Sequence, residues 1–469
     1  MSFVQTEFLA FMAIVFVVYW AIPWRAGQNL FLAVASAVFY GWIHPFWLVL
    51  MYATALLDFG AALGMERFPH RRGWILTLSL VGNLGLLGYY KYFDFFVVNV
   101  DAALGALGIQ AGLLPLGLIL PAGISFYTFQ SMAYTIDVYR GEIAPRRNVV
   151  DYLLAVSLFS HLVAGPVQRA GNLLEQAETD RRFDWARVRD GLGLALWGAT
   201  KKVVVADTIS PYVDKVFGLS NPSPLLVWAA TLGFTVQILA DFSGYTDIAR
   251  GTARMLGFEL MKNFDHPYLA VDPSDFWRRW HISFSTWIRD YLYIPLGGSR
   301  GGFWAATRAT LIAMALSGLW HGAAWNFVIW GVYHGVLLVL YRLAKPRVPK
   351  ALRTSLPGHA AAVVAMFGFT VVGWLLFRDP DLARIARVLT SNPLAVGPDD
   401  AVAATVVGAV TLAGAAFLIA ALWVERVVLP RLSASAWRLP VETTAWAAFA
   451  LLLFLFVRMT AADFIYFQF

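Results

Sequence analysis

The stretch Asn263-Phe-Asp-His-Pro-Tyr-Leu-Ala270 is continued by Asp275-Phe-Trp-Arg-Arg-Trp-His-Ile-Ser283 and later by Leu319-Trp-His-Gly322, whose histidine follows His281 by forty residues. These segments place ionisable side chains among long apolar runs. A charged or titratable group costs several kcal/mol in lipid and is usually retained there for function. This stretch therefore indicates both the kind of protein and the region in which its chemistry takes place.

The composition of the whole chain is that of a polytopic membrane protein. Of 469 residues, 59% are hydrophobic and 14% are charged, whereas charged residues make up about a quarter of a typical soluble domain. The chain has no cysteine, which excludes disulfides, thiolate metal sites and a cysteine nucleophile. The net charge of +7 comes from short basic loops between apolar runs, a pattern typical of topology signals and not of nucleic-acid binding.

The apolar runs predict an all-α protein with about 11–12 transmembrane helices, in one domain over residues 1–469. Positive loops at Arg67, Arg250, Lys345 and Arg426 are expected in the cytoplasm. The run 149–165 is short and has basic residues on both sides, so we expect it to be re-entrant. The runs lie near residues 8–24, 29–44, 46–65, 73–99, 113–135, 149–165, 188–217, 225–249, 305–320, 324–343, 359–377, 402–424 and 442–458.

A helix is predicted to begin at Asp272 and to continue to about Tyr293. Asp272 is suited to the N-cap position, Pro273 to the first helical position, and Asp275 to bonding back to the backbone N–H of the cap. Trp277, Trp280, His281 and Phe284 would then share one aromatic face. The helix either lies at the cytoplasmic boundary or lines a cavity, and an interfacial helix with a merely structural His281 is the alternative.

His321 ends an apolar run in the segment Ser317-Gly-Leu-Trp-His-Gly-Ala-Ala-Trp-Asn326. A neutral imidazole can take up and return a proton near neutral pH, so His321 is a candidate general base. A structural histidine, bonded across helices, is the alternative. His334 is expected to support packing. With only His281 and His321 as ligands, we expect no metal site.

A third polar group lies in the run 225–249. Gln237, Asp241 and Tyr245 share one helical face, and Asp247 is spaced to pair with Arg250 or Arg254. These residues are interpreted as a structural network and not as catalytic groups. Lys201 and Lys202 lie near the end of a run, where snorkelling to the interface explains them.

These motifs resemble the membrane-bound O-acyltransferase family, in the branch that O-acetylates alginate and other exported bacterial polysaccharides. The signature covers about residues 263–335, and the start Ser2-Phe3 with Glu7-Phe8-Leu9 and the ending Phe464–Phe469 also resemble that branch. The resemblance implies tilted helices around a central tunnel, with His321 and His281 as the catalytic pair. Candidate substrate-binding residues are Trp277, Arg278, Arg279, Trp280, Arg289, Trp320 and Asn326; the guanidinium groups among them suit the phosphates of a donor.

The resemblance further implies a multi-pass protein of the bacterial inner membrane that uses no bound cofactor. Acetyl-CoA is the expected donor on the cytoplasmic side, an exported polysaccharide is the acceptor, and an exported SGNH-type esterase-like partner completes the transfer. D-alanyl transfer to teichoic acid and O-acylation of a lipid are alternatives within the family. A transporter or flippase that uses Asp241, Asp247 and the histidines as a proton relay is the alternative from another class, and the absence of related halves in the sequence argues against it.

Overall fold

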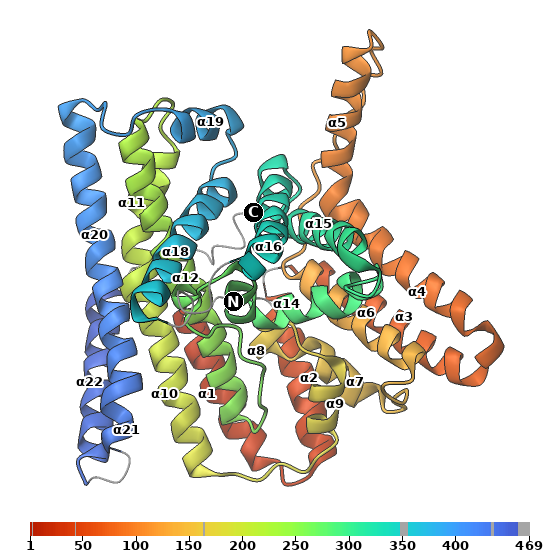
Figure 1. Cartoon of the computed structure of the whole chain (residues 1–469). Helices are drawn as coiled ribbons and strands as arrows, with labels where there is room; N and C mark the ends of the chain where they lie inside the picture. Colours follow the sequence, from red (N-terminus) through yellow and green to blue (C-terminus); the bar gives the residue numbers. More distant parts are fainter. Residues whose placement is uncertain (2, 43, 163–164, 348–354, 433–435, 458–469) are drawn as a thin grey trace. The chain divides into compact units, whose positions relative to one another are not determined.

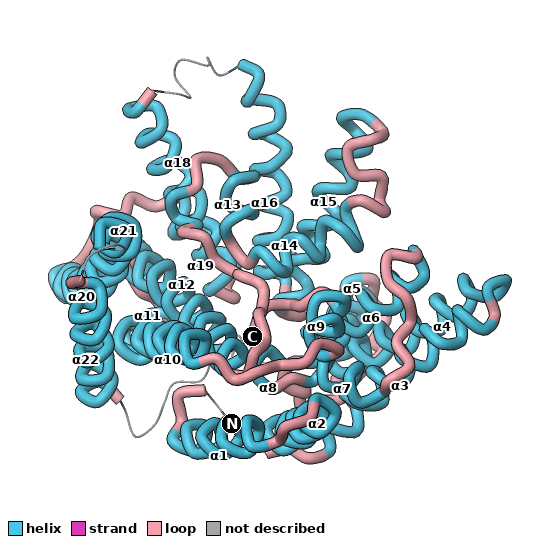
Figure 2. The backbone as a smooth tube through the Cα atoms, turned by 90° about the horizontal axis from the view of Figure 1, so that it is seen from below, coloured by secondary structure: helices cyan, strands magenta, loops and turns pink. Residues whose placement is uncertain are grey.

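The computed structural model describes residues 1–469 except 2, 43, 163–164, 348–354, 433–435 and 458–469. Within the described ranges the chain is built of helices and the turns that join them, without a strand (Figure 2), so the all-α prediction is confirmed. The predicted ending Phe464–Phe469 lies outside the described residues. The chain forms two compact units, one of residues 1–191, 252–261 and 322–324, and one of residues 192–251, 262–321 and 325–469; the single domain over 1–469 stays a prediction.

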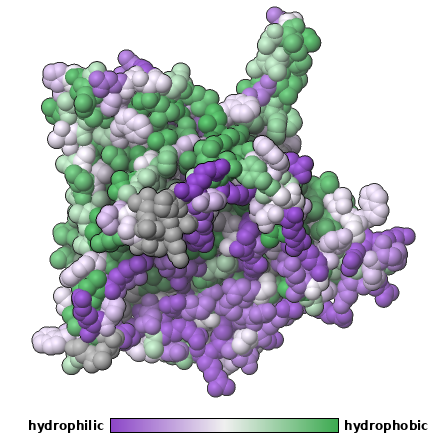
Figure 3. Space-filling model, in the orientation of Figure 1, coloured by the Kyte–Doolittle hydropathy of each residue, from purple (hydrophilic) through white to green (hydrophobic). Residues whose placement is uncertain are grey.

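The first unit is a bundle in which α3 packs on α4 and α6, and α2 packs on α7. From this bundle α5 projects (Figure 1), and its surface is hydrophobic, with Phe96, Val98 and Val100 exposed (Figure 3). The helices are α1 (Thr6–Ala21), α2 (Arg25–Gly41), α3 (Phe46–Arg67), η1 (Pro69–Arg71), α4 (Arg72–Leu87), the π-helical η2 (Gly88–Tyr92), α5 (Phe93–Ala106), α6 (Ile124–Arg140), α7 (Val149–Ser157), α8 (Phe159–Leu162), α9 (Ala170–Ala177) and the start of α10 (Trp185–Thr200).

The second unit contains the signature stretch and the longest helices. Within it α15 packs along α16, and α16 packs on α18. Its elements after α10 are the π-helical η3 (Lys201–Ala206), α11 (Asp207–Phe217), α12 (Pro224–Met255), η4 (Pro267–Leu269), α13 (Pro273–Arg279), α14 (Ile282–Ile288), the π-helical η5 (Arg289–Tyr293), α15 (Gly302–His321), α16 (Trp325–Ala344), η6 (Lys345–Arg347), α18 (Leu356–Arg378), α19 (Leu382–Thr390), α20 (Pro398–Trp423), the π-helical η7 (Val424–Val428), α21 (Leu429–Leu432) and α22 (Arg438–Phe456).

Six helical stretches in the described part of the chain are long and apolar enough to cross a membrane. They agree with a polytopic membrane protein, and the shorter α1 is also apolar. The predicted total of about 11–12 spans goes beyond these six. The six stretches are Phe46–Arg67, Pro224–Met255, Trp325–Arg347, Leu356–Arg378, Pro398–Leu432 and Arg438–Phe456.

The predicted run 113–135 is only partly helical, because α6 begins at Ile124. Pro115 and Pro121 lack the backbone N–H that a helix needs, and Gly117 takes a positive φ of 62°. Asp94 on α5 accepts hydrogen bonds from the N–H groups of Leu116 (2.7 Å) and Gly117 (3.0 Å). These bonds hold the apolar segment before α6 against α5 as a loop without regular secondary structure.

Residues 149–162 of the run 149–165 contain two short helices, α7 and α8, neither of which is long enough to span a membrane in the ordinary way. Asn148 caps α7 by accepting from the N–H of Val150 (3.0 Å). The side chains from Leu154 to Leu162 are buried in the described part of the first unit. Burial within protein is the condition under which broken helices are tolerated at membrane depth; a re-entrant path stays a prediction.

The contact between α15 and α16 depends on two glycines. A Cβ on Gly331 would lie 2.1 Å from the carbonyl oxygen of Met314, and a Cβ on Gly318 would lie 2.1 Å from that of Phe327. Small residues allow two helix backbones to approach closely in membrane proteins. Because His321 ends α15, this close approach also fixes the position of His321 relative to α16.

We predict that Gly331→Ala destabilises the protein by about 1–3 kcal/mol, the usual cost of overpacking. Gly368→Ala on α18 is the matched control, since nothing lies within 4 Å of the Cβ that it would add. The measurement is the thermal unfolding midpoint of the purified protein in detergent. Equal midpoints for the two variants would contradict the tight contact.

Candidate active site

The signature stretch folds back on itself in the second unit. The N–H of Asp265 donates to the carbonyl of Arg279 (2.9 Å), and the N–H of Ile282 donates to the carbonyl of Asn263 (2.9 Å). The Asn263 side chain is fully buried and accepts from the Ser283 hydroxyl at 2.5 Å. The segment 263–265 thus takes over backbone bonds that a continuous helix would use internally.

The continuous helix predicted from Phe276 to Tyr293 is therefore wrong. It is divided into α13 and α14, with Trp280 extended and His281 in the left-handed region at φ 42°. The predicted cap is confirmed, because Asp272 accepts from the N–H of Asp275 (2.7 Å). The Asp275 carboxylate bonds to the N–H of Val271 (3.2 Å) and not to that of the cap.

His281 occupies a backbone conformation that is uncommon for any residue with a side chain. Strained positions of this kind cluster at functional sites and persist only where surrounding bonds determine them. The His281 ring is fully buried, and neither ring nitrogen has a hydrogen-bond partner among the described residues. Burial lowers the pKa of the His281 imidazole to about 3, so the ring is neutral at pH 7 and carries one N–H that is free to donate.

The rings of His281 and His321 are linked by shared aromatic neighbours. The Phe284 ring lies 5.0 Å from the ring of His281 and 5.5 Å from that of His321. Trp320 stacks on Phe284 at 4.2 Å. Each histidine has a further aromatic neighbour. The Phe242 ring lies 4.7 Å from that of His281, and the Phe377 ring lies 5.3 Å from that of His321. The structure thus brings the two predicted catalytic residues into one aromatic cluster.

A cavity of about 440 Å³ reaches this cluster. Phe284 lines it, as does Ser317, which lies one turn before His321 on α15. Its other wall carries three cationic side chains: Arg289, Arg342 and Lys345. Neither His281 nor His321 is part of the cavity lining, and the Phe284 ring, which contacts the rings of both, is the link between them and the cavity. The cavity combines an apolar part at Phe284 with cationic side chains, which suits a ligand that has an uncharged reactive end and an anionic tail.

Arg342, Lys345 and the neighbouring Tyr341 contact residues near the cavity. Tyr341, which also lines the cavity, donates to the carboxylate of Asp272, the N-cap of α13, at 2.7 Å. Arg342 donates to the Thr310 hydroxyl at 3.3 Å, and the Lys345 ammonium lies 5.7 Å from the centre of the Tyr341 ring. Because a hydroxyl and an aromatic ring are uncharged, these contacts do not neutralise Arg342 and Lys345, and the cavity keeps positive charge.

Of the other predicted binding residues, some line the cavity, some form ion pairs outside its lining, and one is buried in the aromatic core. Trp277 and Arg289 line the cavity, and Arg289 also pairs with Asp290 at 2.7 Å. Arg278 and Arg279 lie outside the cavity lining and pair with Asp275 at 3.2 and 3.0 Å. Trp280 is buried behind His281, with its ring 4.7 Å from that of Trp374.

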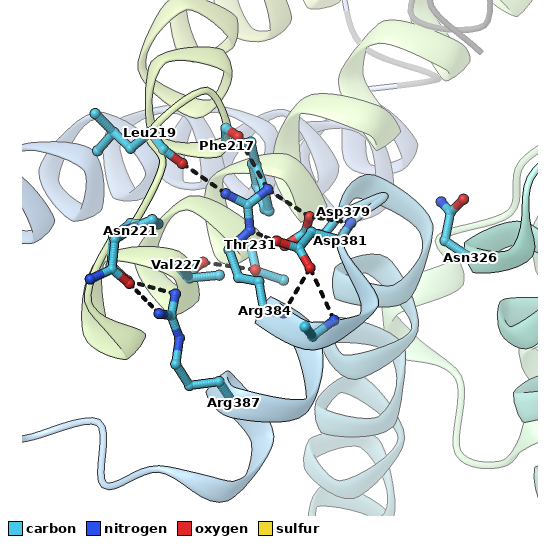
Figure 4. A network of polar contacts seen from close by, with 12 residues as sticks. Phe217, Leu219, Asn221, Val227, Thr231, Asn326, Asp379, Asp381, Arg384 and Arg387 are labelled. Carbon is cyan, nitrogen blue, oxygen red and sulfur yellow. Dashed lines mark hydrogen bonds and ion pairs between the residues drawn. The ribbon is translucent and has the colours of Figure 1, made fainter.

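Asn326 supports the site from outside. It is buried, and its amide donates to the carbonyls of Leu376 (3.4 Å) and Phe377 (3.1 Å) at the end of α18. Just beyond, Arg384 binds both carboxylate oxygens of Asp379 at 2.7 Å and the carbonyl of Leu219 at 2.9 Å (Figure 4). These bonds hold the segment that places Phe377 beside His321, which indicates a positioning role for Asn326.

Gln237, Asp241 and Tyr245 on α12 are all buried, as side chains that point into the bundle must be; their assignment to a structural network stays a prediction. Snorkelling of Lys202 is wrong, because its side chain is 2% exposed and its ammonium bonds to Asp207 and Asp241, each at 2.9 Å. The η3 turn brings Lys202 inward, where two carboxylates offset the cost of burying its charge.

Asp247 has the partner that its spacing predicts and one that the sequence did not indicate. Arg250 lies 3.5 Å away, while Lys201 bonds more closely, at 2.6 Å. Lys201 is therefore also paired inside the protein and does not extend to the interface. Arg254 bonds to Glu259 instead.

His334 packs as expected, with its ring 5.7 Å from Phe276 and 5.0 Å from Trp330. No group of three His, Asp or Glu side chains within the described ranges is arranged to hold a metal ion. Neither Arg342 nor Lys345 was predicted to bind the donor, although Lys345 belongs to a basic loop expected in the cytoplasm and both lie near the end of the α16 run, one turn apart. Asn263 belongs to the signature stretch. Its bonds to Ile282 and Ser283, which stabilise the break at His281, depend on a fold-back that sequence spacing does not indicate.

Comparison with known proteins agrees with the geometry. Residues 146–375 match the model of the membrane-bound O-acyltransferase family. The chain is 41% identical to the probable alginate O-acetylase AlgI of Azotobacter vinelandii over 359 residues, which are 76% of this chain and 70% of that protein. The chain belongs to the membrane-bound O-acyltransferase family. It is thus a multi-pass membrane O-acyltransferase.

Two further relatives mark the range of acceptors in the family. The chain is 33% identical to a peptidoglycan O-acetyltransferase of Helicobacter pylori, over 81% of this chain and 77% of the relative. It is 25% identical to a teichoic acid D-alanyltransferase of Bacillus subtilis, over 56% of this chain and 70% of the relative. The match is thus broader and closer to the O-acetyl-transferring relatives than to the D-alanyl-transferring one.

We predict that His281→Asn retains more activity than His281→Gly or His281→Ala. Asn tolerates the left-handed conformation and keeps an N–H donor. Gly fits the backbone but removes the donor, and a lost donor to a developing oxyanion costs about 10²- to 10³-fold in kcat. The measurement is acyl transfer by each purified variant at saturating donor. If the Gly variant were as active as the Asn variant, the role of His281 would be to adopt the left-handed backbone conformation and not to donate a hydrogen bond.

Proposed function

We propose that this protein transfers acetyl from a cytoplasmic thioester, acetyl-CoA, through a central tunnel for O-acetylation of an exported polysaccharide such as alginate. The observation that carries the proposal is the cavity with a cationic wall that reaches the cluster of His281 and His321. The names of the O-acetyl-transferring relatives support acetyl as the group and a polysaccharide as the acceptor.

The cationic wall suits the donor. Arg289, Arg342 and Lys345 offer guanidinium and ammonium donors to the phosphates of coenzyme A. The thioester end of the donor is uncharged and extends toward Phe284 and Ser317. No ionised group has to enter the apolar part of the cavity, which keeps desolvation costs low.

The chemical step is a direct acyl transfer in this proposal. One imidazole nitrogen of His321 takes the proton of the acceptor hydroxyl while the hydroxyl oxygen forms a bond to the thioester carbonyl carbon. The carbonyl oxygen becomes an oxyanion, to which the free N–H of His281 donates. When the carbon–sulfur bond breaks, the thiolate leaves and receives the proton from His321, so that charge and protons balance.

In the cell, the enzyme of this proposal acts in the bacterial inner membrane, with the donor on the cytoplasmic side and the acceptor hydroxyl on the opposite side. That hydroxyl takes the acetyl group first, and an exported SGNH-type esterase-like partner then completes its transfer to the sugar hydroxyls. The basic loops near Arg67, Arg250 and Arg426 support a cytoplasmic entrance for the donor.

We predict that sealed inside-out vesicles given labelled acetyl-CoA outside pass label to an acceptor enclosed in the lumen, and that right-side-out vesicles do not. The cytoplasmic face is exposed only in the first preparation, and acetyl-CoA does not cross a sealed bilayer. The measurement is label in the luminal acceptor after removal of external donor. Equal labelling in both orientations would contradict transfer across the membrane.

The control for that assay is His321→Gln in the same vesicles. Glutamine keeps the approximate size of histidine but cannot accept a proton from the acceptor. We expect labelling to be lost while the protein remains inserted at the wild-type level. Wild-type labelling by this variant would remove His321 from the mechanism.

We predict that Arg342→Gln or Lys345→Gln raises the KM for acetyl-CoA about tenfold and changes the KM for acetyl-pantetheine, which has no phosphate, by much less. A charge-assisted bond is worth about 1.5–3 kcal/mol, so loss of one is measurable. Arg438→Gln, an exposed arginine on α22, is the control. Parallel changes for both donors would assign these cations to packing, and Arg278→Gln in the same assay tests the sequence-based assignment of Arg278.

A further inference from the structure

A buried carboxylate lies outside the acyl-transfer site, in the first unit. Asp58 is fully buried on α3, one of the six helices with the length and composition of a membrane span. An ionisable residue in such a helix is costly and usually has a functional partner. The mechanism proposed above does not use Asp58.

The neighbours of Asp58 are hydroxyl and amide groups from α4 and α6. Ser79 and Ser131 donate their hydroxyls to the two carboxylate oxygens. The Asn83 amide nitrogen lies 2.9 and 3.0 Å from the same two oxygens. Thr135 lies behind Ser79, with 3.5 Å between their hydroxyl oxygens, and all four neighbours are buried.

The charge of Asp58 is not balanced by a basic side chain. In the part of the chain that the structure describes, no Lys, Arg or His forms an ion pair with it. The buried aspartates of the second unit differ, since Asp241 pairs with Lys202 and Asp379 pairs with Arg384. Buried charges are normally paired or bind a metal ion. The single negative charge of one carboxylate would be balanced by one bound monovalent cation.

A second observation points to a ligand at the same place. The carbonyl oxygen of Asn83 is buried and has no hydrogen-bond partner among the described residues, although the amide faces the Asp58 carboxylate. The oxygen and nitrogen of an amide are interchangeable in shape. A half-turn of this amide would give up the 3.0 Å hydrogen bond from its nitrogen to the Ser79 carbonyl and place its oxygen beside both that carbonyl and the carboxylate. The Ser79, Ser131 and Thr135 hydroxyls would then complete an all-oxygen set, the ligand type that hard cations prefer.

We propose that Asp58, Asn83, Ser79, Ser131 and Thr135 bind one Na⁺ ion that ties α3 to α4 and α6. A single carboxylate neutralises a monovalent cation, and neutral oxygens supply the remaining ligands. The ion would stabilise the helices of the first unit and is not a participant in acyl transfer.

The test is the thermal unfolding midpoint of the full purified chain in detergent. NaCl is titrated against choline chloride and against KCl at constant ionic strength and pH. We expect a saturable rise of at least about 2 °C with Na⁺, following the one-site binding relation, and a smaller rise with K⁺. Asp58→Asn removes the charge and is expected to abolish the rise.

Asp151→Asn is the matched control, because Asp151 is also a buried carboxylate of the first unit, bonded to Asn29 at 2.7 Å. This variant is expected to keep the Na⁺ response. If Asp58→Asn does not fold, Ser131→Ala takes its place and is expected to weaken the response at least tenfold in Na⁺ concentration. A wild-type midpoint that does not respond to Na⁺, that responds equally to K⁺, or that depends on pH alone would overturn the proposal; the last result would assign a proton to Asp58.

Discussion

The site depends on the hydrogen bonds between the segment 263–265 and the segment 279–283. They replace the internal helix bonds of Arg279, Ile282 and Ser283, and in doing so they place His281 in a left-handed conformation with a free N–H. Without the Asn263 carbonyl and side chain, the apolar periodicity of Phe276 to Phe284 would favour a continuous helix. The His281 ring would then lie on a helix face instead of at the break between two helices.

The close approach of α15 and α16 complements this break. Gly318 and Gly331 let the two backbones touch, so that His321 at the end of α15 and Trp330 on α16 lie with their rings 5.1 Å apart. The end of α18 adds Phe377, held by Asn326 and by the Asp379–Arg384 pair. Three supports therefore converge on the two histidines: the hydrogen bonds at the break, the glycine contact between α15 and α16, and the polar bonds at the end of α18.

The sequence predicts the membrane class and most helices, because these follow from composition and apolar runs. The cap at Asp272 and the burial of the polar residues on α12 depend on neighbours in the chain and were predicted well. The break at His281 and the inward turn of Lys202 depend on contacts with segments distant in sequence. Arg342 and Lys345 were not predicted to bind the donor for the same reason, since a basic residue at the end of a span has the same pattern whether it meets a lipid phosphate or a donor phosphate.

The π-helical turns have a consequence for how this chain can vary. Each such turn accommodates one residue more than the α-helix around it, so the residues after it are rotated by about 100° relative to an unbroken helix. In η3 this rotation separates the face of α10 from that of α11 and directs Lys202 toward Asp241. Deleting one residue there would restore a regular helix and yet turn every later side chain of α11 away from its present neighbours. Length changes inside these helices are therefore far less tolerable than substitutions.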